Sequence, residues 1–208
     1  MSVRRGALIV LEGIDRTGKT TQAAKLVEAL RADGIKVSAK RYPDRTTATG
    51  TVINAYLQNK AELDDHVIHL LYSANRWEAK AEMEALLSSG TTLVVDRYSF
   101  SGVAFSHAKG MDFEWCCAPE RGLPAPDVVI MLELDIEQAK QRGDYGAERY
   151  EKEEFQKLVK KAYDSLRAPN WVSVNAGREI EEIHVDLKRI AREAINKAAD
   201  EPLKKLWV

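Results

Sequence analysis

Five short runs of aliphatic and β-branched residues stand out along the chain. Within each run the apolar residues follow one another, without the alternation of polar and apolar positions that a half-exposed strand shows. Such runs are typical of strands that are buried on both faces. The predicted strands are residues 7–11, 36–40, 92–95, 128–132 and 171–174, of which the second and the fifth are the weaker.

Longer segments with helical periodicity separate these runs. They cover residues 19–33, 63–88, a segment from Ile136, 151–166 and 180–199, and several stop near Gly34, Gly90 or Pro169. The alternation of strand and helix predicts an α/β fold, a five-stranded parallel sheet with helices on both faces. Ligands of such sheets bind at the carboxyl ends of the strands, so the residues that follow each strand are the first candidates for a site.

The composition is that of one globular domain. The chain has 208 residues, 45% hydrophobic and 30% charged, and no Pro/Gly/Ser-rich stretch interrupts it. We therefore expect a single domain over residues 1–208. With 31 basic and 32 acidic residues the formal net charge is -1, so the overall charge attracts neither nucleic acid nor an anionic membrane surface. Any anion must be bound by a local site.

The sequence favours a cytoplasmic location. Its longest apolar runs are far shorter than the ~20 residues of a membrane span, and residues 1–6 lead into the first run without a signal-peptide pattern. Cys116 and Cys117 are adjacent and cannot easily bridge each other or form a metal cage, which fits a reducing compartment.

Residues 13–20 fit the pattern G-x-x-x-x-G-K-[ST] at every fixed position. The glycines allow the backbone to curl so that its N–H groups point at phosphate oxygens, and the helix that follows adds its positive end. Lys19 is expected to reach the β- and γ-phosphates, and Thr20 to hold Mg²⁺. Because the loop lies between a predicted strand and a predicted helix, we expect a protein that binds a nucleoside triphosphate.

A GTPase switch does not fit the rest of the sequence. Residues 96–99 lack the glycine of Asp-x-x-Gly, and residues 59–62 lack the aspartate of Asn-Lys-x-Asp and follow no strand. Arginines instead gather at the predicted ligand edge of the sheet: Arg16, Arg41, Arg45 and Arg97. Guanidinium groups bind phosphate oxygens bidentately, so this set indicates a cleft where two phosphorylated molecules meet.

Several blocks together resemble the thymidylate kinases, and specifically their eukaryotic and poxviral branch. They are residues 13–20, 41–45, 69–78, 96–105 and 122–127. The Asp-Arg-Tyr block that starts at Asp96 is the most specific, and the resemblance covers nearly the whole chain. In one departure, many members continue that block with Phe or Tyr and then Gln, where this chain has Phe105 and Ser106.

The resemblance implies a phosphate-loop NTPase fold and a homodimer that converts ATP and dTMP to ADP and dTDP in dTTP biosynthesis, with Mg²⁺ on the donor phosphates. It implies a catalytic set of Arg16, Lys19, Asp96 and Arg97. The ATP-binding set is Gly13, Arg16, Thr17, Gly18, Lys19, Thr20, Thr21 and Arg142. The substrate-binding set is Asp15, Arg45, Tyr72, Arg76, Arg97, Ser101, Phe105 and Tyr150. Thr20, and Asp96 through a water molecule, make the metal set.

Some of these roles have independent support from the residues. Tyr72 and Arg76 are four apart on one helical face, where a ring can stack on a pyrimidine and a guanidinium can donate to a carbonyl. Asp15 is a carboxylate inside an anion-binding loop, which fits its implied contact with the sugar 3'-hydroxyl. Residues 141–150, with two glycines amid charges, are expected to form a small lid.

Two alternatives stay open at this point. A deoxynucleoside kinase or other small-molecule kinase of the same fold would phosphorylate a neutral hydroxyl with the help of a carboxylate base. A nucleotide-binding regulator would sense ATP and transfer nothing. The presence of both Arg45 and Arg97 favours a phosphate acceptor over the neutral hydroxyl that a deoxynucleoside kinase would phosphorylate. The four histidines are expected to be structural or solvated, because an ionised phosphate needs no general base.

Overall fold

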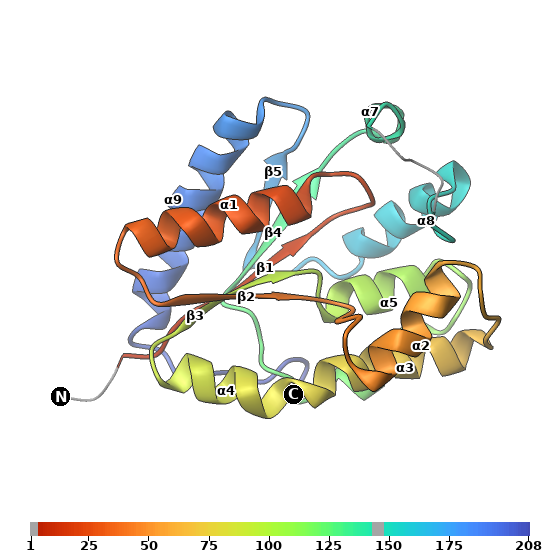
Figure 1. The fold of residues 1–208 in the computed structure, drawn as a ribbon, viewed down its shortest axis with the longest axis horizontal. Helices are drawn as coiled ribbons and strands as arrows, with labels where there is room; N and C mark the ends of the chain where they lie inside the picture. The colour runs from red at the N-terminus through yellow and green to blue at the C-terminus, as the bar shows by residue number, and fades with distance from the viewer. Residues whose placement is uncertain (1–3, 143–147) are drawn as a thin grey trace.

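The computed structural model describes residues 4–142 and 148–208 (Figure 1). Five strands form one parallel sheet in the order β2-β3-β1-β4-β5, as the apolar runs predicted. Each strand ends one residue later than its predicted run, on a polar side chain that the apolar pattern excluded. The strands are β1 (Leu8–Glu12), β2 (Val37–Arg41), β3 (Thr92–Asp96), β4 (Val128–Glu133) and β5 (Trp171–Asn175).

Helices cover both faces of the sheet, which confirms the predicted layers (Figure 1). Successive side chains of β1 point to opposite faces: Leu8 and Val10 join one core cluster, and Ile9 and Leu11 join the other. The first cluster packs under α4 (Lys80–Ser88), α5 (Ser99–His107) and α8 (Glu153–Asp164). The second packs under α1 (Lys19–Ala32) and α9 (Ile180–Ala198). The central strand is therefore buried on both sides.

The predicted helix over 63–88 is wrong as a single element. The structure has α3 (Asp65–Glu78) and α4, separated at Ala79, which ends the first helix and begins the second. Ala79 keeps backbone angles near the helical region, so the apolar periodicity continues across the break.

Other helices were not predicted, except that the start of the last of them was predicted at Ile136. They are α2 (Ala48–Leu57), α5, α6 (Phe113–Cys117), a 3-10 turn η1 (Ala118–Glu120) and the short α7 (Ile136–Lys140). Side chains cap two of these helices: Thr47 accepts a hydrogen bond from the Gly50 amide at the start of α2, and Asp112 accepts one from the Trp115 amide at the start of α6.

Half of the predicted lid, residues 143–147, lies outside the described residues. Arg142 and residues 148–150 are described, and they border the site treated below. Within the described ranges, no helix combines the length and the apolar character that crossing a membrane requires.

Candidate active site

The loop between β1 and α1 has the backbone of a phosphate cradle. Gly13 and Gly18 have φ angles of 147° and 90°, and Arg16 also lies in the left-handed region at 63°. A Cβ on Gly13 would approach the Leu132 carbonyl oxygen to 2.6 Å, so the loop packs closely against β4. Gly18 precedes α1 without a side-chain cap, which leaves the first amides of that helix to bind an anion.

One cavity of about 740 Å³ brings nearly all the predicted site residues together at the carboxyl ends of β1 and β3. Gly13 is the exception, since it packs behind the loop and does not line the cavity. The predicted residues that line it are Asp15, Arg16, Thr17, Gly18, Lys19, Thr20, Thr21, Arg45, Tyr72, Arg76, Asp96, Arg97, Ser101, Phe105, Arg142 and Tyr150. Their roles remain predictions, but their convergence on one cavity is a property of the fold.

Lys19 is buried at the base of the loop. Its Nζ donates to the Ile14 carbonyl oxygen at 2.6 Å and to the Thr17 hydroxyl at 3.1 Å. Burial, followed by the nearby charge of Arg97, lowers the pKa of Lys19 to about 7. The ammonium is thus held by neutral oxygens of the loop itself, in a position where phosphate charge would stabilise its protonated form.

Oxygen donors of two elements meet beside Lys19. The Thr20 hydroxyl at the start of α1 donates to Asp96 Oδ2 at the end of β3, at 2.6 Å. Arg41 Nε lies 3.5 Å from the same carboxylate oxygen. A hydroxyl and a carboxylate are hard ligands, and Mg²⁺ bound with a nucleotide needs only one or two of them from the protein. The donor set therefore fits the predicted metal role of Thr20 and Asp96.

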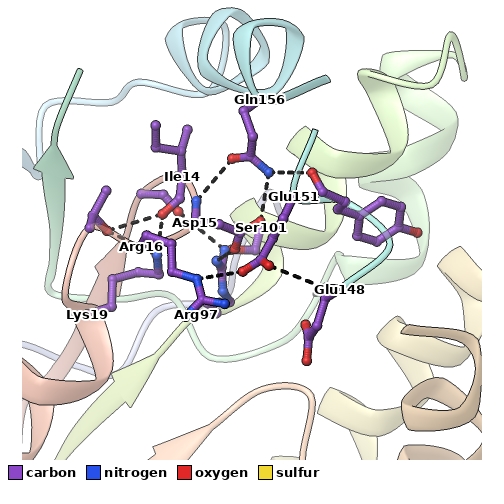
Figure 2. Close-up of polar contacts among 12 residues, drawn as sticks. Ile14, Asp15, Arg16, Lys19, Arg97, Ser101, Glu148, Glu151 and Gln156 are labelled. Atoms are coloured by element: carbon purple, nitrogen blue, oxygen red, sulfur yellow. Dashed lines mark hydrogen bonds and ion pairs between the residues drawn. The ribbon is translucent and has the colours of Figure 1, made fainter. Parts of the chain in front are cut away.

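Carboxylates bind three arginines of the cavity, two of which, Arg16 and Arg97, are drawn in Figure 2. Arg16 Nε lies 2.7 Å from Glu151 Oε1, and Arg45 Nη2 lies 2.8 Å from Glu148 Oε1. Arg97 pairs with Asp15 in the same way. No sequence pattern predicted the glutamate partners, because both lie in a charged segment far from the arginines along the chain. A bound phosphate would compete with the glutamates for the guanidinium groups of Arg16 and Arg45.

A buried carboxylate holds the turn that carries Arg97. Glu12 accepts hydrogen bonds from the backbone amides of Tyr98 and Ser101 at 2.9 and 3.1 Å, and from the Ser101 hydroxyl at 2.5 Å. Burial raises the pKa of Glu12. Arg97 has a φ of 65°, a strained angle for a residue with a side chain. Glu12 ends an apolar strand directly before the loop, a position that the sequence reading overlooked.

Gln156 of α8 is a second residue that the sequence reading missed. Its Nε2 donates to Asp15 Oδ2 at 2.7 Å and to the Tyr150 carbonyl oxygen at 2.8 Å, and its Oε1 accepts from the Asp15 amide at 3.0 Å (Figure 2). Asp15 is thereby held by Gln156 on one carboxylate oxygen and by Arg97 on the other.

Aromatic rings line the end of the cavity away from the phosphate loop. Phe105 packs against Tyr150 with ring centroids 5.5 Å apart, and Tyr72 lines the same end from α3. Arg76 also lines it, and its Nε and Nη2 both bind Glu120 in a pair that is almost completely buried. Its predicted contact with the base stays a prediction. Of this guanidinium, only Nη1 has no hydrogen bond within the described part of the chain.

The opposite end of the cavity is held by Arg142. Its Nη1 donates to the Arg16 carbonyl oxygen at 2.9 Å, and its Nη2 to the Ala176 carbonyl oxygen at 2.7 Å. Ile180 and Ile183 of α9 line the cavity at residues that the sequence reading did not select. An arginine plane beside apolar side chains suits the predicted contact with a purine base.

The fold and this cavity define a phosphate-loop protein with a nucleoside triphosphate site beside a second, aromatic-lined subsite. The thymidylate kinase family model matches residues 11–187. The chain is 52% identical to a thymidylate kinase of Arabidopsis thaliana over 98% of its own length and 78% of that protein. It is 47% identical to that of Homo sapiens over the full length of both. The chain belongs to the thymidylate kinase family, as its motifs indicated.

A solved structure supports the same conclusion. The thymidylate kinase of Candida albicans superposes with a TM-score of 0.88 at 34% identity, over 97% of this chain and 98% of that one. The similarity confirms the predicted phosphate-loop NTPase fold.

Proposed function

We propose that this protein transfers the γ-phosphoryl group of ATP to dTMP, giving ADP and dTDP, as a step in dTTP biosynthesis. The observation that carries the proposal is the single cavity in which the phosphate loop and an aromatic end are joined by Arg45 and Arg97. Two phosphorylated ligands fit such a cavity, since each end can take a base and the cations lie between them.

The reaction needs no general base. The attacking oxygen belongs to the acceptor phosphate, whose second pKa is about 6 and which is therefore largely ionised near neutral pH. Catalysis then consists of alignment and of neutralising charge on the transferred group. Arg45 binds the acceptor phosphate, Arg97 lies between the two phosphate groups, and Lys19 and Arg16 stabilise the phosphoryl group in transit. Arg16 and Arg45 each exchange a glutamate partner for a phosphate, whereas Arg97 keeps Asp15 through one nitrogen.

Mg²⁺ enters with the nucleotide. Thr20 would hold it directly and Asp96 through a water molecule, which the 2.6 Å contact between the two side chains supports. The cation supplies charge neutralisation on the donor phosphates when bound.

An assay with three acceptors tests the reaction against its alternatives. ADP release is measured with dTMP, with thymidine and with no acceptor. We expect release that depends on dTMP. Turnover of thymidine in preference to dTMP would indicate a deoxynucleoside kinase, and ATP binding without acceptor-dependent release would indicate a regulator.

Asp15 provides a test of acceptor binding. We expect it to accept a hydrogen bond from the 3'-hydroxyl of dTMP, with Gln156 and Arg97 keeping its carboxylate in place. Asp15→Asn should weaken dTMP more than 3'-deoxy-dTMP, because only dTMP has a hydroxyl contact to lose. Steady-state KM values for both acceptors decide this. Equal losses would show that the substitution only disturbs the loop.

We also propose that the protein is a homodimer of the cytoplasm. One face of α3 carries three apolar residues at helical spacing, Val67, Leu70 and Trp77. Each of these side chains is between 39% and 47% exposed. An apolar face of this kind suits an isologous contact between two copies. The proposed compartment agrees with Cys116 and Cys117, both of which are free thiols.

A further inference from the structure

A buried histidine lies behind the aromatic end of the cavity. His69 belongs to the same face of α3 as Tyr72 and Arg76, but it has no exposed surface and does not line the cavity. Its Nδ1 lies 2.7 Å from the Ser106 hydroxyl of α5, and its Nε2 lies 3.0 Å from the Cys116 carbonyl oxygen. The sequence predicted only a structural role for this residue, and the mechanism above does not use it.

The 3.0 Å contact of Nε2 with the Cys116 carbonyl oxygen assigns the tautomer of His69, since the Gly102 carbonyl oxygen makes a weaker contact with the ring. A carbonyl oxygen can only accept a hydrogen bond, so Nε2 must carry a hydrogen to face Cys116. Burial, followed by the positive charge of Arg76, lowers the pKa of His69, so the ring is neutral near pH 7. A neutral ring with hydrogen on Nε2 has a bare Nδ1. Ser106 therefore donates its hydroxyl hydrogen to His69.

Ser106 lies on the cavity face of α5. Tyr98, Ser101, Gly102, Phe105 and Ser106 all line the cavity, and their spacing is that of one helical face. Ser106 is one turn after Gly102, where a Cβ would come within 2.5 Å of Arg76 Nη2. The missing side chain at Gly102 brings the arginine, the serine and the aromatic ring of Phe105 to one place.

We infer that Ser106, oriented by His69, is a specificity-determining acceptor for the N3–H group of the thymine base. This inference rests on the proposed function and adds to it the residue that reads the base edge. A serine hydroxyl ordinarily donates or accepts, so it distinguishes poorly between bases. Because His69 takes the hydrogen of Ser106, only the oxygen lone pairs remain for a ligand.

An acceptor at this point selects against cytosine. Thymine carries a hydrogen on N3, whereas cytosine has an unprotonated N3 that is itself an acceptor. Two acceptors face each other if cytosine is bound, and a buried polar group without a partner is costly. The position is also the one at which the chain departs from family members with glutamine, whose amide offers both a donor and an acceptor.

The first test removes the N3–H group from the substrate. In N3-methyl-dTMP, a methyl group replaces the hydrogen on N3 while both carbonyl oxygens stay. For the unmodified protein we expect kcat/KM to fall by about tenfold or more from dTMP to this analogue. Ser106→Ala should show nearly the same kcat/KM for both, and Ser106→Thr, which keeps the hydroxyl, should retain the preference.

A second test changes the orientation of the hydroxyl without touching Ser106. In His69→Asn the amide oxygen replaces Nδ1 as an acceptor, whereas in His69→Gln the amide reaches the position of Nε2 and leaves the serine hydrogen unclaimed. We expect His69→Gln to lower the preference for dTMP over 5-methyl-dCMP, and His69→Asn to keep it. Both readouts are ratios within one preparation, so a partly folded variant does not distort them.

The outcomes separate this inference from the proposed function. Equal sensitivity to N3-methyl-dTMP in the unmodified protein and in Ser106→Ala would overturn the role of Ser106. An unchanged base preference in His69→Gln would overturn the inference that His69 orients the Ser106 hydroxyl. Absence of any dTMP-dependent ADP release from the unmodified protein would instead contradict the proposed function.

Discussion

Lys19 couples nucleotide binding to protonation. Its pKa of about 7 lies well below the ordinary lysine value, so at about pH 8 the side chain is mostly neutral before a ligand binds. Phosphate charge raises that pKa again, and we expect ATP binding to take up close to one proton per site at this pH. The apparent affinity for ATP should therefore weaken as pH rises above 7.

Calorimetry in buffers of different ionisation enthalpy measures this uptake. Lys19→Arg is the matched control, because a guanidinium stays protonated throughout this range. Its binding should show no uptake. Equal uptake in both proteins would assign the proton to another group.

Arg16 and Arg149 provide a test of where the transition-state charge is stabilised. Arg16 lines the cavity inside the phosphate loop, whereas Arg149 is bound to Glu62 and to the Tyr56 carbonyl oxygen and does not line the cavity. We expect Arg16→Ala to lower kcat by roughly a hundredfold or more, because it acts on charge that develops during transfer. Arg149→Ala should cost much less.

Steady-state kinetics at saturating ATP and dTMP compare the two variants. A greater loss of kcat in Arg149→Ala would show that a cation of the 148–150 segment, and not the loop arginine, supports the transfer. It would also contradict the branch of the family to which the motifs assign the chain.

Residue chemistry was predictable where it is encoded locally. The phosphate loop fixes Lys19 and Thr20 within eight consecutive positions, and both line the cavity. The partners Glu120, Glu148 and Gln156 follow no such spacing. They become neighbours of the site only through packing of elements that are distant along the chain, and no local pattern encodes that contact.

A buried ion pair joins α3 to η1, beside the hydrogen bonds that Ser73 and Trp77 donate to the Pro119 carbonyl oxygen. Arg76 and Glu120 are 2% and 0% exposed, and two guanidinium nitrogens bind the carboxylate. Arg76→Ala leaves Glu120 buried without a partner, so we expect the free energy of unfolding to fall by about 3–5 kcal/mol. Any change in dTMP turnover measured for this variant must therefore be corrected for the folded fraction.

Urea unfolding provides the measurement. Replacing both partners with apolar residues, as in Arg76→Met with Glu120→Leu, should recover most of the loss. Arg121→Ala is a control, because its pair with Glu114 is exposed and should be worth less than about 1 kcal/mol. A loss in Arg76→Ala as small as the control would show that the buried pair does not hold η1 against α3.

Elements were predictable to the extent that their apolar positions repeat. The three inner strands, β3, β1 and β4, were found because each contains an uninterrupted apolar run that is buried on both faces. The edge strands β2 and β5 include polar residues and were therefore the weaker predictions. Helix α5 was missed for the opposite reason: seven of its nine residues, from Ser99 to Ala104 and Ser106, are buried, so no polar face gives it a period. The break at Ala79 was missed because the apolar residues before and after it keep the same helical spacing.

Assembly of the whole molecule can be tested through α3. Val67→Asp combined with Leu70→Asp should convert a dimer to a monomer, since charge on this exposed apolar face opposes its burial against a second copy. Folding should be unaffected because neither side chain is buried. Sedimentation velocity measures the mass in solution.

Val185→Asp is the matched control, because Val185 is 67% exposed on α9 and lies on another helix. It should leave the dimer intact. A monomer from the unmodified protein at micromolar concentration would contradict the proposed assembly, and dissociation by Val185→Asp alone would place the contact elsewhere.

The glutamates beside the cavity arginines determine which anions the empty protein attracts. Glu151 and Glu148 serve Arg16 and Arg45 as built-in counter-ions. A guanidinium group that is already paired with a carboxylate offers little to chloride, however concentrated that ion is. A doubly charged phosphate can displace a single carboxylate oxygen and engage a guanidinium through two hydrogen bonds. Because of the two glutamates, singly charged small ions do not displace the carboxylates from Arg16 and Arg45, whereas the more highly charged phosphates of nucleotides do.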